Sequence, residues 1–376
     1  MIQKMKVTQV FLIALLISIV SCTTKVEKPK TIEKIATQAD TEVEFGVWIT
    51  ANEEKSNEDY ALEFEKYKNG GIDEVLINTG TDPVLLKRIA PIAKEKGLKV
   101  HAWIMTMNRP GDKVALEHPE WYAVSKEGKS CFDTRPYVEY YQWLCPTRKE
   151  SREHILGLVE GLAKIDGIES VHLDYIRFSD IFLPIGLLPK YNLKQETELP
   201  EFDFCYCDVC ISEFEKIHHK NPKESGNTSI DMEWKQFRLN AVKRVVDEAY
   251  EIAHKYDKKL TAAVFPYPEM ADHMVRQRWD KWNIDEVYPM IYHGFYNEDT
   301  DWIGFATRQG VKDVKGKGIN VNTGLYIPSF KSKAELWEAI TLSIENGASG
   351  VTFFDGPALT DEYLLTIKDI KESLKR

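Results

Sequence analysis

Three carboxylates in the sequence follow strand-like segments and are the first candidates for chemistry. Asp174 lies in the alternating stretch VHLDYIRF (171–178), Glu269 comes just after KLTAAVFPY (259–267), and Asp355 lies near the end of GASGVTFFDG (347–356). Two carboxyl groups that flank a bond of a substrate can cleave that bond. One protonates the leaving group, while the other stabilises the cation that forms, attacks it or activates water. We therefore take Asp174, Glu269 and Asp355 as candidate catalytic residues.

The neighbours of these carboxylates favour different roles. Arg177 is close to Asp174, and a guanidinium would keep that carboxylate ionised, which favours a nucleophile or base. Proline and tyrosine flank Glu269 in FPYPEM, and desolvation there would raise its pKa and suit a general acid. The structural alternatives are an Asp174–Arg177 ion pair that holds a loop and an exposed Glu269. Asp355 has the alternative of capping the loop before the last helix.

Strand-like and helix-like stretches alternate along the chain and must position these groups. The expected strands are 44–50, 72–80, 98–108, 171–178, 259–267, 284–293, 320–328 and 347–356. Eight βα units without an antiparallel hairpin predict a (β/α)8 TIM barrel, with a long cysteine-containing insertion (179–230) in the fourth βα loop. A doubly wound sheet usually has a glycine-rich phosphate loop after its first strand, and ITANEEKS is not such a loop.

Two helix starts have a local signature. Thr147-Arg-Lys-Glu150 and Ser332-Lys-Ala-Glu335 have the spacing of capping boxes, in which two side chains accept the free amides of the first turn. The spacing predicts helices that begin at these residues.

The strand ends form a polar and aromatic ring. A barrel binds its ligands there, so we expect these side chains to bind substrate: Trp48, Asn78, Trp103, Arg177, Tyr267, Tyr292, His293 and Tyr326. Nine tryptophans and seventeen tyrosines supply flat faces on which sugar rings stack, although core packing is the alternative for each one. The net charge of −10 argues against a nucleic-acid partner. The ring and its carboxylates suit a carbohydrate.

Four ordered motifs resemble the bacterial glycoside-hydrolase-like TIM-barrel proteins, the family-10-like glycosyl hydrolases. They are WLCPTRKESREHI, VHLDYIRF, WNIDEVYPMIYHGFY and GASGVTFFDG. The resemblance extends from about Glu44 to the C-terminus. It implies a barrel, a polysaccharide-related role and a site residue at the fourth-strand aspartate, Asp174.

The sequence departs from the true family 10 enzymes, which place glutamates after strands four and seven. Here strand four ends in Asp174, and LYIPSF after strand seven has no carboxylate, so that retaining mechanism does not carry over. A fourth-strand aspartate is similar to the nucleophile of α-glycosidase barrels, which is an analogy of fold alone.

The fourth loop contains a compact set of thiols. Cys205, Cys207 and Cys210 in FDFCYCDVCISEF need one more ligand for a tetrahedral zinc site. The run resembles the structural zinc cluster of family 42 β-galactosidases, and Cys131 or Cys145 would supply the fourth thiolate, with His218 or His219 as further alternatives; we take Cys131 as the candidate. The alternatives in an exported protein are two disulfides with one thiol left over, or free thiols.

The N-terminus predicts export and a membrane anchor. A basic start, the apolar run VFLIALLISIV and ISIVSC resemble a lipoprotein signal peptide (1–22), with Cys22 as the lipidated residue. An ordinary secretory signal is the alternative. Residues 23–41 are expected to be a flexible tether, and 42–376 a single barrel domain held on the cell envelope.

Together these features predict a glycoside hydrolase that acts on a polysaccharide or oligosaccharide and needs no cofactor for catalysis. Because strand seven has no carboxylate, the alternative is a non-catalytic carbohydrate-binding lipoprotein on the same scaffold. A metal-dependent hydrolase is disfavoured, since the sequence has no HxH after strand one and no histidine–carboxylate cluster at the strand ends.

Overall fold

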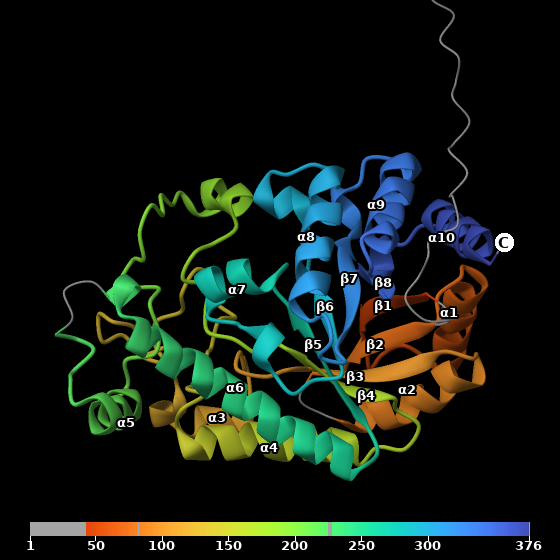
Figure 1. Cartoon of the computed structure of the whole chain (residues 1–376). Coiled ribbons are helices and arrows are strands. Elements are labelled where there is room, and N and C mark those ends of the chain that lie inside the picture. The colour runs from red at the N-terminus through yellow and green to blue at the C-terminus, as the bar shows by residue number, and fades with distance from the viewer. Residues whose placement is uncertain (1–42, 81–82, 225–227, 376) are drawn as a thin grey trace, which may run out of the picture. The chain divides into compact units, whose positions relative to one another are not determined.

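The fold is a closed barrel of parallel strands surrounded by helices (Figure 1). The computed structural model describes residues 43–80, 83–224 and 228–375, so the expected signal peptide, Cys22 and the tether lie outside the described residues. Neighbouring strands pair in chain order, and β8 pairs with β1. The strands are β1 (Glu44–Thr50), β2 (Glu74–Asn78), β3 (Lys99–Met105), β4 (Ser170–Asp174), β5 (Lys259–Val264), β6 (Glu286–Pro289), β7 (Asn320–Tyr326) and β8 (Gly350–Phe354). The predicted (β/α)8 barrel is confirmed.

A helix follows each strand and packs on the outside of the barrel. These helices are α1 (Asn57–Asn69), α2 (Pro83–Glu95), α4 (Lys149–Ala163), α6 (Met232–Lys255), α7 (Pro268–Val275), α8 (Thr300–Asp313), α9 (Lys333–Glu345) and α10 (Asp361–Leu374). Among the described helices, none combines the length and the hydrophobicity that a membrane span requires.

The lower part of the barrel interior is filled by buried polar side chains. His101 lies 2.7 Å from Ser170 and 3.1 Å from Glu74, which also accepts a hydrogen bond from Tyr288. Above them, Trp48 donates its indole N–H to the buried His172. Each of these side chains has a partner within the barrel, so the layer is a satisfied network that supports the aromatic residues above it.

Two long loops lie beside the C-terminal ends of the strands. Loop 3 (106–148) joins β3 to α4 and contains α3 (Lys113–Leu116), and loop 4 (175–231) joins β4 to α6 and contains α5 (Asp208–His218). A backbone bridge between Ser125 and Phe204 connects the two loops. In Figure 1, α5 lies to one side of the strands, near the start of α6, which it contacts. The long connection after β4 was predicted.

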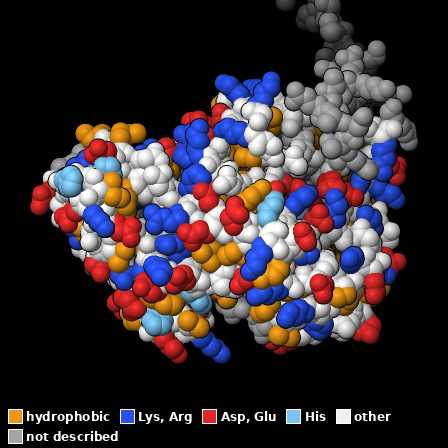
Figure 2. Space-filling model, turned by 60° about the horizontal axis from the view of Figure 1, so that its bottom comes forward, with side chains coloured by type: hydrophobic (Ala, Val, Ile, Leu, Met, Phe, Trp, Pro, Cys, Tyr) orange, Lys and Arg blue, Asp and Glu red, His pale blue; other side chains and the backbone are white. Residues whose placement is uncertain are grey.

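Buried ion pairs attach loop 4 to the helices beneath it. The fully buried Arg238 of α6 pairs with Asp203 and donates to the carbonyl oxygen of Phe204 at 2.9 Å. Arg276, just after α7, pairs with Glu198 at 2.5 Å. On the face of the molecule in Figure 2, basic and acidic side chains are interspersed.

Candidate active site

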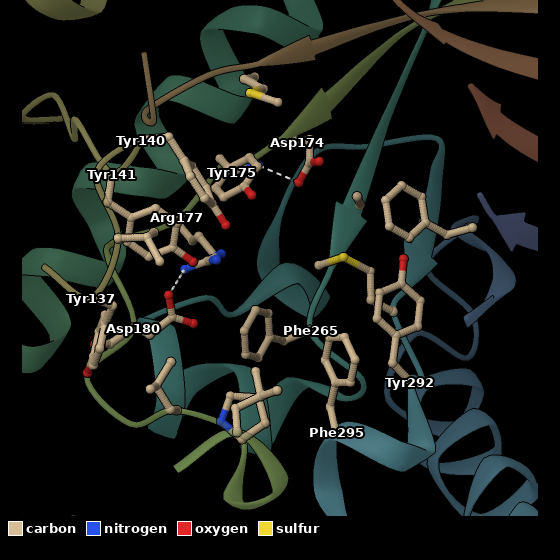
Figure 3. Close-up of a pocket in the computed structure, with 18 of the residues that line it drawn as sticks. Tyr137, Tyr140, Tyr141, Asp174, Tyr175, Arg177, Asp180, Phe265, Tyr292 and Phe295 are labelled. Carbon is tan, nitrogen blue, oxygen red and sulfur yellow. Dashed lines mark hydrogen bonds and ion pairs between the residues drawn. The ribbon is translucent and has the colours of Figure 1, made fainter. Parts of the chain in front are cut away.

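A cavity of about 470 Å³ opens at the C-terminal ends of the strands, between loops 3 and 4 and the segment after β6. Its volume is within the range of small-molecule sites. Figure 3 shows tyrosines of loop 3 and Arg177 on one side of it, with Tyr292 and Phe295 on the other. The predicted site residues that line it are Trp48, Asn78, Trp103, Asp174, Arg177, Tyr292 and Asp355.

Asp174 lies at the floor of the cavity, at the last position of β4. Val171 and Leu173 point outward and are fully buried, so the alternation of the strand turns Asp174 into the barrel. Its carboxylate accepts the Trp103 indole N–H at 3.1 Å and the Tyr175 backbone N–H at 2.6 Å. Tyr175 then turns the chain with a φ of 51°. The strand thus ends on a residue whose side chain both faces the cavity and stabilises the turn.

Burial raises the pKa of Asp174 above its ordinary value. The Tyr175 amide, the Arg177 guanidinium and the Trp103 indole each lower it, but desolvation outweighs them. The expected effect of Arg177 is present, because the guanidinium lowers the pKa of Asp174, but burial outweighs it and the net shift is upward. This net shift favours a proton donor over the nucleophile or base expected from the sequence. A carboxyl group with a raised pKa is suited to donate a proton.

Arg177 pairs with Asp180, and not with Asp174. The two charged groups lie 3.2 Å apart (Figure 3), and both are buried. Arg177 also donates to the carbonyl oxygen of Phe178. The guanidinium carbon of Arg177 lies 4.9 Å from the centroid of the Trp143 ring and 4.9 Å from the centroid of the Phe265 ring. This pair fixes the wall of the cavity between loops 3 and 4.

Asp355 faces the same cavity from the opposite side of the barrel. It follows β8 directly, lines the cavity and is half-buried. In a ring of eight strands in chain order, β8 is directly across from β4. The structure therefore brings together two of the three predicted carboxylates, Asp174 and Asp355.

Four predicted site residues do not line the cavity. Glu269 is exposed in the first turn of α7, beside Asp313, so the sequence was wrong to expect a desolvated acid there. Tyr267 precedes the same helix and contacts Phe305. His293 packs against Phe330 away from the cavity. Tyr326 lies behind the lining and contacts the rings of three residues that do line it, Tyr292, Phe295 and Phe354. These are corrections to the predicted substrate-binding set.

The two tryptophans of the cavity floor have fixed orientations. The indole of Trp48 is held by His172 and that of Trp103 by Asp174, at 3.1 Å in each case. Both rings belong to a buried apolar cluster that also contains Tyr288. Rings with their N–H groups already bonded present edges and faces that do not need to reorganise when a ligand binds.

Sequence reasoning missed the aromatic wall from loop 3. Tyr137, Tyr140 and Tyr141 line the cavity, and Tyr141 lies edge-on to Tyr175. The run YVEYYQW (137–143) contains four aromatic residues in seven, which is the signal that was available. Asp180 was missed as well, although its position three residues after Arg177 indicates an ion pair.

The sequence matches the profile of one protein family along most of its length. The glycosyl hydrolase-like 10 family matches residues 11–336. This chain belongs to the glycosyl hydrolase-like 10 family. No curated protein matches the sequence significantly.

Solved structures share the fold of this glycosyl hydrolase-like 10 protein. The glycoside hydrolase domain of PgaB (BpsB) from Bordetella bronchiseptica has a TM-score of 0.65 and 13% identity over 88% of this chain and 99% of that one. The catalytic domain of β-amylase from Paenibacillus polymyxa has a TM-score of 0.62 and 10% identity, covering 89% and 98%. A β-galactosidase from Marinomonas ef1 has a TM-score of 0.61 and 12% identity, covering 89% of this chain and 60% of that one. At these identities the likeness shows the barrel fold alone.

The structure changes the predicted set of clustered cysteines. The sulfur atoms of Cys145, Cys205, Cys207 and Cys210 lie within 4.8 Å of one another, all buried. Cys131, the predicted fourth member, lies outside this group, and burial raises the pKa of its thiol to about 12. None of the described cysteines forms a disulfide.

Proposed function

We propose that this protein hydrolyses glycosidic bonds of a polysaccharide or oligosaccharide in the cavity at the C-terminal end of the barrel. The observation that carries the proposal is Asp174, a carboxyl group with a raised pKa at the floor of a cavity lined by aromatic rings. Membership of the glycosyl hydrolase-like 10 family supports it. The named activities of the structural relatives also support it, since they include a glycoside hydrolase domain, a β-amylase and a β-galactosidase.

In this proposal Asp174 is the general acid that protonates the leaving oxygen. Burial keeps a fraction of its carboxyl group protonated at a pH where an exposed aspartate is ionised. Trp103 and the Tyr175 amide stabilise the carboxylate that remains after proton transfer, because both donate hydrogen bonds to it. The site therefore supports both protonation states that an acid passes through.

Asp355 is the partner carboxylate in this proposal. It approaches from β8, across the barrel from β4, so a sugar and a water molecule can lie between the two groups. Inverting glycosidases need about 6.5–9.5 Å between their carboxyl groups and retaining enzymes about 5–5.5 Å. The separation of the two carboxyl groups decides between these outcomes, and we assign Asp355 the activation of water, the role that belongs to inversion.

Asp180 is the third carboxylate of the cavity, and we assign it a binding role. Its ion pair with Arg177 leaves it committed to a cation and less suited to proton transfer. Charged groups fixed in this way can accept and donate hydrogen bonds to sugar hydroxyls without reorganising.

Carbohydrate binding without turnover is the second candidate function. The observation that favours it is the strongly aromatic lining, which suffices for stacking on sugar rings without any catalysis.

A panel of polysaccharides separates the two functions. We expect the purified protein to release reducing ends from at least one of them, and both Asp174→Asn and Asp355→Asn to lose that release while they still bind the polysaccharide. Binding without release by the wild type would instead support the second function. Release that is unchanged in both variants would contradict the assignment of the catalytic pair.

We also propose that the protein is held on the cell envelope by a lipid on Cys22. The support is the sequence alone, in which an apolar run ends in ISIVSC and a polar segment separates it from the barrel.

A further inference from the structure

The four clustered cysteines lie outside the cavity and have no part in the proposed hydrolysis. Cys145 comes from the end of loop 3, whereas Cys205, Cys207 and Cys210 come from loop 4, before and within the first turn of α5. Their sulfur atoms converge although Cys145 and Cys205 are sixty residues apart in the chain. We propose that these four thiolates bind one zinc ion, which crosslinks loops 3 and 4.

The spacing of the sulfur atoms fits a single tetrahedral ion. Zinc–sulfur bonds of about 2.3 Å place the sulfurs of a tetrahedral site about 3.8 Å apart. Here the sulfur of Cys145 lies 3.6 Å from that of Cys207 and 3.5 Å from that of Cys210, and no pair exceeds 4.8 Å. A disulfide needs about 2.05 Å. The four sulfurs therefore surround a common centre and are not arranged as two bonded pairs.

The surroundings of the cluster suit thiolates. The backbone N–H of Val124 donates to the sulfur of Cys205 at 3.4 Å, and the backbone N–H of Cys210 donates to the sulfur of Cys207. Arg148 lies close enough to Cys207 and Cys145 to interact with their charge. Amide donors and a nearby cation stabilise the net negative charge of a zinc ion bound by four cysteines.

Zinc suits the set better than an iron–sulfur cluster. Tetrahedral sites of four sulfurs bind zinc or iron–sulfur clusters. In a cluster the four thiolates are shared among two or four irons, so as a set they lie further apart than around one ion. The separations of 3.5 and 3.6 Å correspond to one shared ion. Four protein ligands also leave no open position, so the ion has a structural role.

The proposed ion joins the two loops that form the walls of the cavity. Loop 3 supplies Tyr137, Tyr140 and Tyr141 to the cavity wall, and loop 4 supplies Asp180 and Tyr191. An ion held by both loops fixes these two walls relative to each other. We therefore expect its loss to loosen the loops and leave the barrel strands intact.

Metal content tests the proposal directly. The full-length protein is purified with reductant and without added metal, and zinc and iron are measured by inductively coupled plasma mass spectrometry. We expect one zinc per chain in the wild type and in Cys131→Ser, and little or none in Cys145→Ser. Cys131→Ser is a matched control, because Cys131 is a buried thiol of the same loop 3 outside the cluster.

Two further measurements keep the test decisive if Cys145→Ser folds poorly. Wild-type protein refolded with Co²⁺ should show the visible absorption of tetrahedral cobalt thiolates. Removing the metal from the wild type with a chelator should increase hydrogen exchange in loops 3 and 4 and leave the exchange of β1–β8 unchanged. Three results would overturn the proposal. They are stoichiometric iron in the purified wild type, disulfides among the four cysteines of a wild type that is purified without any metal, and equal zinc loss in Cys131→Ser and Cys145→Ser.

Discussion

The Asp174 side chain has two roles at the end of its strand: it stabilises the turn at Tyr175 and it faces the cavity. The backbone must turn into loop 4 at Tyr175, which adopts a left-handed φ of 51° at a cost of about 1–2 kcal/mol for a residue other than glycine. The Asp174 carboxylate offsets part of that cost by accepting the Tyr175 amide. The same carboxylate faces an apolar cavity, which raises its pKa. A strained turn beside a perturbed acid is typical of a functional site.

A substrate with a good leaving group tests the role of Asp174 at the residue scale. We expect Asp174→Asn to lower kcat/KM about 10²- to 10⁴-fold on an unactivated glycoside. The loss should be much smaller on a dinitrophenyl glycoside, whose leaving group needs no proton. Steady-state kinetics on both substrates measures the difference. Asp355→Asn should lose activity on both, because activation of water is needed whatever the leaving group.

The pH profile of the wild type follows from the same group. A general acid works in its protonated form, which is present below its pKa and is lost as the pH rises through it. Because burial raises the pKa of Asp174, the alkaline limb should lie at a higher pH than an ordinary aspartate would give, and Asp174→Asn should lose that limb on the activated substrate. Glu269→Gln is the control for both tests and should change neither rate nor profile, since Glu269 is exposed outside the cavity. A profile of Asp174→Asn that keeps the limb would contradict the assignment.

At the scale of elements, a capping box predicted the start of a helix correctly only where its first side chain accepts a backbone N–H of the first turn. Ser332 accepts the Glu335 amide and begins α9, as the capping box predicts. At α4 the box was wrong, because Arg148 is the N-cap and the buried hydroxyl of Thr147 has no partner among the described residues. Thr147 lies two residues after Cys145, where the chain is held by the cysteine cluster. Tertiary contacts there override the local preference.

The attachment of loop 4 to α6 depends on Arg238. Arg238→Met should lower the free energy of unfolding by about 3–5 kcal/mol, because it leaves the buried charge of Asp203 without its cation. Hydrogen exchange should increase first in loop 4. Lys66→Ala, which removes an exposed ion pair with Asp361, is the control and should cost no more than about 1 kcal/mol.

The deficit of Arg238→Met should depend on pH. Burial raises the pKa of Asp203, but Arg238 and the Tyr206 hydroxyl together lower it by more, so the pKa lies below its ordinary value. The wild type therefore gains stability above the unfolded pKa of about 4, and loses it as the pH falls through the lower folded pKa. The variant lacks that gain, so denaturation curves of the two proteins should converge as the pH falls below about 4. A constant difference would show that Arg238 acts through packing alone.

At the scale of the whole molecule, the barrel is separated from the predicted anchor by a polar segment, residues 23–41. We expect the native host, or a bacterium that processes lipoproteins, to attach lipid to Cys22 and hold the protein in the membrane fraction. Cys22→Ser should move it to the soluble envelope fraction with unchanged activity. Mass spectrometry of the N-terminus and fractionation measure this outcome. Soluble wild type with an unmodified N-terminus would instead favour an ordinary secretory signal.

The sequence was sufficient for the barrel because its elements are encoded locally. Alternation in stretches such as VHLDYIRF, amphipathic helices between them, and the absence of a phosphate-binding loop are visible within short windows. The same alternation puts Asp174 on the face of the strand opposite to Val171 and Leu173, and the structure shows that this face is the inner one. For Asp355, Trp48 and Trp103 the position at a strand end was enough.

Tertiary structure alone decided which of the remaining groups share a site. Glu269 and Asp355 follow strands in the same way, yet one is exposed on α7 and the other faces the cavity, because the backbone leaves each strand in a different direction. Arg177 forms its ion pair with Asp180 and not with Asp174. Cys145, and not Cys131, lies in the cysteine cluster, because loops 3 and 4 fold against each other. Pairing between distant loops and the desolvation of a carboxyl group depend on three-dimensional surroundings, and no window of sequence contains them.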